Sequence, residues 1–237
     1  MRWLGRLRPG GRSPRQQVAD ALQLARAGQP DDAIAAIAGP YPEALTYLEA
    51  LGGPDETAWL RLDARLQFRA GQMREAAATI ERSLSLEEDA ASWNLLGRIR
   101  VWLRDRRSDE AFARAARLDP EHYAKPYRVG RDRFVALADR ALAKIPAAFH
   151  ERLANTMIVV DDLPTLESVR EGEDPDLLGL YEGATVLEHG LPERIVLYQR
   201  NHENISASLG ELREQIDETM AHEIGHHFGM DEDELPY

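Results

Sequence analysis

A pattern that recurs along the N-terminal half most constrains the fold of this 237-residue chain. Trp59 opens the stretch WLRLDARLQFRAGQMREAAATIERSLSLEE, and Trp93, 34 residues later, opens WNLLGRIRVWLRDRRSDEAFARAARLDP. A period between about 20 and 50 residues is typical of chains built from stacked structural repeats. Small residues let paired helices approach closely, and each repeat buries its apolar side only against a neighbouring repeat. The pattern therefore predicts a stack of helical hairpins.

The two stretches resemble the tetratricopeptide repeat, in which paired antiparallel helices cross at small residues. A weaker copy lies upstream, in VADALQLARAGQPDDAIAAIAGP. We therefore predict a tetratricopeptide-like repeat domain over residues 16–125, which offers a surface for a protein partner and no chemistry of its own. The alternative is an Ala- and Leu-rich helical bundle without repeats. The residues in matching places are Gly28, Ala33 and Ile37, then Leu62, Gly71, Ala76 and Ile80, then Leu96, Gly97, Phe112 and Ala115.

Charge divides the chain near residue 145. Residues 145–237 hold five Lys and Arg against 21 Asp and Glu, whereas the formal net charge of the whole chain is −12. A strongly acidic segment argues against nucleic acid as a partner and favours cations. Residues 1–15 are basic and are interpreted as a flexible arm. No apolar run reaches the roughly 20 residues that span a bilayer, so we expect a cytoplasmic protein without a membrane span.

The second half of the chain predicts an α+β layout. Residues 126–145 read as a helix that links the two halves. The β-branched run 156–162 predicts a strand, and two further strands are expected around 178–182 and 194–199, separated by turn residues. The acidic stretch LESVREGEDPDLLG predicts a loop between the first two strands. We assign 146–237 to a small domain in which a sheet packs on a helix.

The last helix is the best-defined element of the sequence. Ser208 and Glu211 form a capping box, which satisfies the exposed amide groups at a helix start. Leu212, Ile216, Met220 and Ile224 recur about once per turn and predict one buried stripe. Gly229 is a typical C-terminal stop, so the helix is expected from Leu209 to Phe228.

This helix ends in the sequence HEIGH, with His222, Glu223 and His226. Residues four apart share one face of a helix, so both imidazoles can reach one zinc ion at about 2.0–2.1 Å. Glu223 points about 100° around the helix, where it can act on a metal-bound water. The chain has no cysteine, so any metal ligand must be His, Asp or Glu. The alternative is a surface helix with incidental histidines.

The segment HEIGHHFGMDEDEL resembles the minimal zincin-like bacterial metallopeptidases. The predicted strands LLGLYEG and RIVLYQRN, which precede it, strengthen the resemblance. The resemblance covers about residues 146–235 and implies a compact zincin fold with zinc on His222 and His226. It also implies an acidic third ligand after Gly229. The spacing of long zincins selects Glu232, while Asp231 and Asp233 stay open as alternatives.

Two functions follow from these observations. The first is a zinc-dependent metallopeptidase in which Glu223 takes a proton from the zinc-bound water and passes it to the leaving amine of a peptide or protein substrate. The peptide would pair with an edge strand, for which Leu178 to Gly183 is the candidate. The second is a non-catalytic scaffold that holds structural zinc and binds a partner through its repeats. A structural zinc site has no need of Glu223.

Overall fold

A computed structural model describes residues 13–37, 40–53, 56–146, 153, 156–183 and 193–228. The described residues form two compact units. A helical unit runs to Ala124 and also contains Thr165–Pro175, and a mixed unit contains Lys125–Pro164 and the residues from Asp176 onward. Helices precede a small mixed sheet along the chain, which confirms the α+β class predicted from the sequence. No helix in the described part of the chain is long and apolar enough to cross a membrane.

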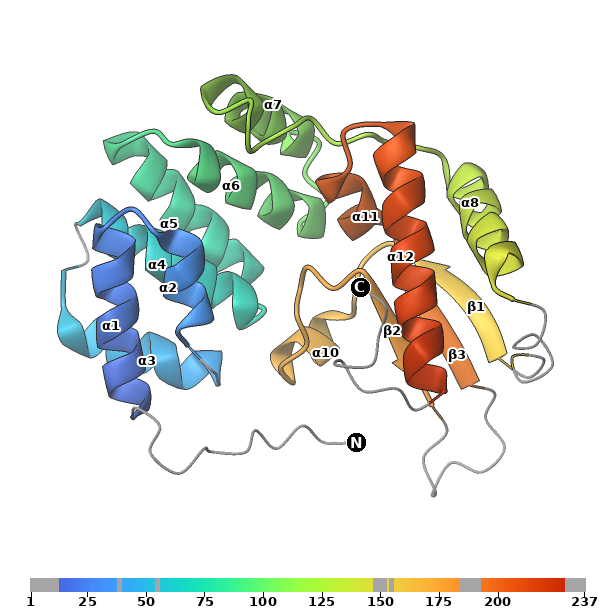
Figure 1. The fold of residues 1–237 in the computed structure, drawn as a ribbon. Helices are drawn as coiled ribbons and strands as arrows, with labels where there is room; N and C mark the ends of the chain where they lie inside the picture. Colours follow the sequence, from blue (N-terminus) through green and yellow to red (C-terminus); the bar gives the residue numbers. More distant parts are fainter. Residues whose placement is uncertain are drawn as a thin grey trace. The chain divides into compact units, whose positions relative to one another are not determined.

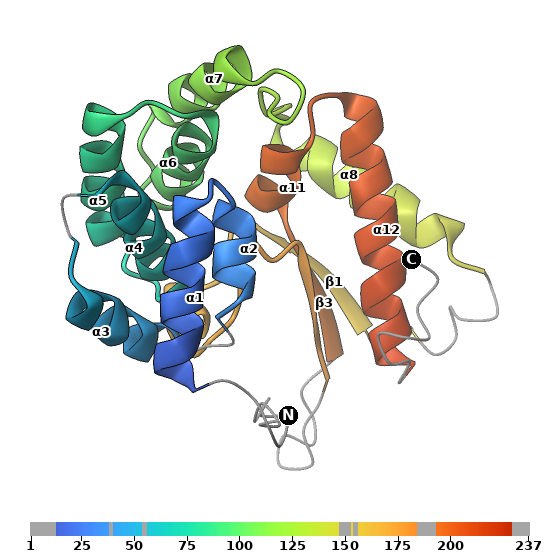
Figure 2. The same ribbon diagram turned by 60° about the vertical axis from the view of Figure 1, so that its left-hand side comes forward.

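The helical unit is a series of short helices in which sequence neighbours pack against each other, notably α4 on α5 and α6 on α7. Figure 2 shows these helices side by side, coloured from blue to green. This arrangement confirms the predicted stack of helices, while its identification as tetratricopeptide repeats stays a prediction. The helices are α1 (Pro14–Arg26), α2 (Pro30–Ala35), α3 (Tyr41–Leu51), α4 (Thr57–Arg69), α5 (Met73–Leu86), α6 (Ala90–Trp102) and α7 (Ser108–Leu118).

Residues of the repeated pattern account for the close packing of these helices. Trp59 is buried, and its indole nitrogen donates a hydrogen bond to the carbonyl oxygen of Leu48 at 3.2 Å. Gly97 on α6 lies against the ring of Phe112 on α7, where a Cβ atom would come within 2.9 Å of the ring carbons. The glycine therefore lets the two helices approach closely, as expected for small residues at a helix crossing.

The acidic segment after the first strand is not the loop that its turn residues predicted. It contains a short helix, α10 (Leu166–Arg170), which starts at a Thr165 cap. Val169 is 1% exposed and joins a core cluster of the helical unit. Gly71 has a positive φ of 73°, and a Cβ atom built on it would lie 3.0 Å from the Cγ of Arg170 on α10. Arg69 forms an ion pair with Asp174. These distant contacts, rather than local propensity, order the segment.

Within its described residues, the mixed unit is built on a three-stranded sheet with the order β1-β3-β2. The strands are β1 (Thr156–Asp161), β2 (Gly179–Glu182) and β3 (Glu193–Tyr198). The central strand β3 runs parallel to β1 and antiparallel to β2. Among the described strands, β2 pairs with β3 alone and forms an edge of the sheet.

Among the described residues, the mixed unit also contains three helices: α8 (Arg131–Lys144), α11 (Gln199–Ile205) and α12 (Leu209–His227). Figure 1 shows α12 beside α8 and over the strands, and direct contacts join α12 to α8, β2 and β3. The apolar stripe of α12 is buried as predicted, and α8 contributes to the same core. The segment that was expected to link two domains is thus part of the core of this unit. Its buried residues are Phe134, Leu137, Ala138 and Ala141.

The start of α12 has the predicted capping box. The Ser208 hydroxyl oxygen accepts a hydrogen bond from the backbone nitrogen of Glu211 at 3.2 Å. The Glu211 carboxylate in turn accepts one from the backbone nitrogen of Ala207 at 2.7 Å. Because both exposed donors have partners, the helix start is fixed. The register of the residues four turns further along the helix is fixed with it.

Candidate metal centre

The last turns of α12 bring the two predicted imidazole ligands together. The Nε2 atoms of His222 and His226 lie 3.0 Å apart, and the ring centroids are 4.6 Å apart with an angle of 84° between the planes. Two nitrogens on one tetrahedral zinc ion are separated by about 3.3 Å. The donor pair therefore fits a shared zinc ion within a few tenths of an ångström. Both side chains are partly exposed, so solvent reaches this point of the helix.

Glu223 lies on a neighbouring face of the same helix and is 7% exposed. Its side chain packs against the backbone of β2. A Cβ atom built on Gly179 would lie 3.0 Å from the Glu223 Cγ and 3.1 Å from its Oε1. One step along a helix turns the side chain by about 100°, which separates this carboxylate from the imidazole pair. Glu223 is thus placed between the helix and the edge strand, beside the two histidines.

The third ligand lies outside the described residues. Glu232 and the alternatives Asp231 and Asp233 all follow residue 228, where the described part of the chain ends. Within the described residues, no group of three His, Asp or Glu side chains is close enough to hold a metal ion. The assignment of Glu232 therefore stays a prediction.

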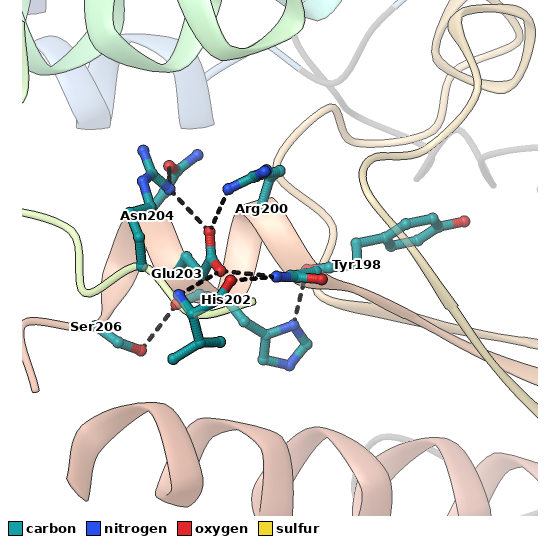
Figure 3. Close-up of polar contacts among 9 residues, drawn as sticks. Tyr198, Arg200, His202, Glu203, Asn204 and Ser206 are labelled. Carbon is teal, nitrogen blue, oxygen red and sulfur yellow. Dashed lines mark hydrogen bonds and ion pairs between the residues drawn. The ribbon is translucent and has the colours of Figure 1, made fainter. Parts of the chain in front are cut away.

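The structure adds a buried histidine that the sequence analysis left out of the site. His202 on α11 is fully buried. Its Nδ1 is 2.9 Å from the carbonyl oxygen of Tyr198, which Figure 3 shows as a dashed line, and its Nε2 is 3.1 Å from the Thr219 hydroxyl. Because a carbonyl only accepts, Nδ1 bears the proton and donates, and Nε2 accepts from Thr219. Thr219 precedes Glu223 by one helical turn, so His202 contacts the helix face that carries the carboxylate.

A buried carboxylate holds α11 in place. Glu203 is fully buried and accepts hydrogen bonds from the backbone nitrogen of Val129 at 3.1 Å and from the side chain of Gln199 at 2.8 Å. Its second oxygen faces Arg200 at 2.9 Å and Arg128 at 3.4 Å. Figure 3 shows Glu203 at the centre of these contacts. Because paired charges and donors satisfy this carboxylate, its role is to join α11 to the chain before α8.

Burial of His202 predicts a loss of stability in acid. Burial lowers the pKa of His202 from 6.5 to about 4. The hydrogen bond to the Tyr198 carbonyl raises the pKa, but its effect is smaller. Because the pKa of His202 is lower in the folded state than in the unfolded state, the contribution of this residue to stability is complete above pH 6.5. That contribution is lost as the pH falls toward 4. We expect the free energy of unfolding to decrease by up to about 3 kcal/mol over this interval from this group.

Urea unfolding at a series of pH values measures this effect. The His202→Asn variant keeps a donor for the Tyr198 carbonyl but cannot titrate, so its stability should vary less with pH between 6.5 and 4. Equal pH dependence in the parent and the variant would contradict the prediction, whatever their absolute stabilities.

Comparison with known families supports the interpretation of the C-terminal part of the chain. Residues 153–237 match the sequence model of the family described as zincin-like metallopeptidase. The match includes the sheet, α10, α11 and α12 and leaves out the helices from α1 to α8. It confirms the resemblance predicted from HEIGHHFGMDEDEL. No curated protein gives a significant match to the chain.

The C-terminal part of the chain is therefore similar to zincin-like metallopeptidases in both sequence and α+β architecture. The family description indicates a zinc peptidase, which agrees with the converging imidazoles of His222 and His226.

Proposed function

We propose that this chain is a zinc-dependent metallopeptidase in which His222, His226 and Glu232 hold zinc and Glu223 acts as the general base. The observation that carries the proposal is the 3.0 Å approach of the Nε2 atoms of His222 and His226, with the buried carboxylate of Glu223 between them in sequence and packed against the edge strand. The match of this segment to zincin-like metallopeptidases supports it.

Glu223 provides the acid–base chemistry in this proposal. Zinc, when bound, lowers the pKa of a coordinated water toward about 7 and polarises the scissile carbonyl. The Glu223 carboxylate accepts a proton from the attacking water and donates it to the nitrogen of the leaving amine. Because Glu223 is 7% exposed, few other water molecules reach it, and its position is set by the packing of α12 on β2.

The edge strand β2 offers a place for an extended substrate. Among the described strands β2 pairs only with β3, through a register that matches Gly179 with Leu197 and Glu182 with Arg194. An extended peptide can pair with such an edge through backbone hydrogen bonds. We propose that β2 aligns the substrate beside Glu223, which packs on the first residue of this strand. The helical unit would bind a protein partner or hold a protein substrate.

Metal removal tests the proposed function directly. We expect the purified chain to hydrolyse an unfolded protein such as reduced casein, and 1,10-phenanthroline to lower the rate at least about 100-fold, because removing zinc removes the activation of water. Added zinc should restore the rate. The isomer 1,7-phenanthroline, which does not chelate, is the matched control.

Two outcomes would contradict the peptidase proposal. Hydrolysis that persists in metal-free protein would exclude zinc from the reaction. Stoichiometric zinc binding without hydrolysis of any unfolded substrate would favour the second candidate, a scaffold that holds structural zinc and binds a partner through its helices.

A further inference from the structure

Gly179, the first residue of β2, lies in direct contact with the face of α12 that carries Thr219 and Glu223. A Cβ atom built on Gly179 would lie 2.6 Å from the Thr219 Cγ2, 3.0 Å from the Glu223 Cγ and 3.1 Å from the Glu223 Oε1. Carbon atoms that are not bonded reach their optimal separation at about 3.5–4.0 Å. A side chain at this position must therefore displace Thr219, Glu223 or the strand.

Pairing and hydrogen bonds restrict the movement of this strand away from α12. Gly179 pairs with Leu197 in the sheet register. Just before it, the carbonyl oxygen of Leu178 accepts a hydrogen bond from the backbone nitrogen of Tyr198 at 2.8 Å. The carbonyl oxygen of Leu177 accepts another from the Asn201 side chain at 2.7 Å. These contacts hold Gly179 and the two residues before it against the rest of the unit.

A contact with α11 also restricts the movement of Thr219. It is 8% exposed, and its hydroxyl lies 3.1 Å from the Nε2 of His202. His202 is itself fixed by the Tyr198 carbonyl and by an edge-on contact with the ring of Phe134, whose centroid is 5.5 Å away. Because the strand and Thr219 are both restrained, displacement caused by a side chain at Gly179 falls largely on Glu223.

We propose that Gly179 is a positioning residue, whose missing side chain creates the space in which the Glu223 carboxylate is held for catalysis. This inference rests on the proposed function, since it gives Glu223 a catalytic position to keep. The three atoms nearest to a Cβ at this position belong to Thr219 and Glu223, so we expect His222 and His226 to bind zinc independently of Gly179.

The Gly179→Ala variant tests this role through kinetics. A shift of a catalytic group by about 1 Å can cost up to about 100-fold in rate, so we expect kcat to fall at least about tenfold with KM within about twofold of the parent. Zinc content should stay at the parental level. The control is Gly130→Ala in the same unit, because a Cβ atom there meets nothing within 4 Å.

A second substitution separates catalysis from folding. Thr219→Ser removes the Cγ2 atom that makes the shortest contact and keeps the hydroxyl that faces His202. In the double variant Gly179→Ala with Thr219→Ser, we expect the melting temperature to recover only part of the way toward that of Thr219→Ser alone, because the contact with Glu223 remains, while kcat stays low. A parental kcat in the double variant would overturn the proposal.

A double-mutant cycle tests the contact without any measurement of activity. The Glu223→Ala substitution removes the Cγ and Oε1 atoms that a side chain at position 179 would meet. In a Thr219→Ser background, Gly179→Ala should lower the urea midpoint, and the shift should fall by at least about half when Glu223 is truncated. An equal shift in both backgrounds would overturn the inference. If the two substitutions are energetically coupled but the chain hydrolyses no substrate, the packing of Gly179 on Glu223 is supported. Only the peptidase proposal is then contradicted.

Discussion

The Glu223→Gln variant will hydrolyse unfolded protein at least about 100-fold more slowly than the parent chain and will keep its zinc. Glutamine has the same shape as glutamate, so it preserves the packing against Gly179, where a Cβ atom would lie 3.1 Å from the Glu223 Oε1. Its amide cannot accept the proton of the attacking water. Parallel measurements of kcat and of zinc content separate loss of the base from loss of the metal.

A matched acid on the same helix controls for the change in charge. Glu214 is exposed on α12, and Glu214→Gln should retain parental activity and zinc content. Full activity in Glu223→Gln would remove this carboxylate from the reaction. Equal losses in both variants would trace the effect to the charge of the helix rather than to a base at position 223.

The His222→Ala and His226→Ala variants will each bind zinc more than about 100-fold more weakly than the parent. Loss of a residue that only supports a ligand costs about 10- to 100-fold in affinity, and loss of a ligand itself should cost more. The Nε2 atoms converge to 3.0 Å, so each truncation leaves a single imidazole at this position. Competition with a chromophoric chelator measures the affinity, and the metal content of the purified protein gives the stoichiometry.

The histidine series has its own control and a clear contrary result. His122 is an exposed residue of the helical unit whose ring contacts Asp119, and His122→Ala should bind zinc like the parent. Equal zinc in the parent and in His222→Ala would refute the site. Alanine variants of Asp231, Glu232 and Asp233 in the same assay identify the third ligand, and we expect the loss at Glu232.

Local signals were sufficient to predict α12. Its capping box and its once-per-turn apolar stripe depend on residues within the helix, and the observed end at His227 differs from the predicted end by one residue. The spacing of His222 and His226 likewise predicted their approach, because residues four apart share a helix face whatever surrounds them. The three strands were predicted from short β-branched and aromatic runs.

Elements that depend on distant contacts were not predicted. The short helix α10 is ordered by the burial of Val169 in the helical unit, and nothing in its acidic sequence indicates that burial. The role of α11 depends on Glu203 and its contact with Val129, more than 70 residues away along the chain. The contact between Gly179 and Glu223 also joins residues far apart in sequence. Periodicity within a segment contains no information on such pairs.

The path of the chain limits how this protein can be divided. Thr165–Pro175 belongs to the helical unit, although the residues on both sides of it belong to the mixed unit. The described chain therefore passes between the units at three places, and a cut after Ala124 would separate Val169 from the apolar residues that surround it. The N-terminal helices cannot be removed without affecting the rest of the chain. They complete the fold of Thr165–Pro175, and this segment leads directly into the edge strand.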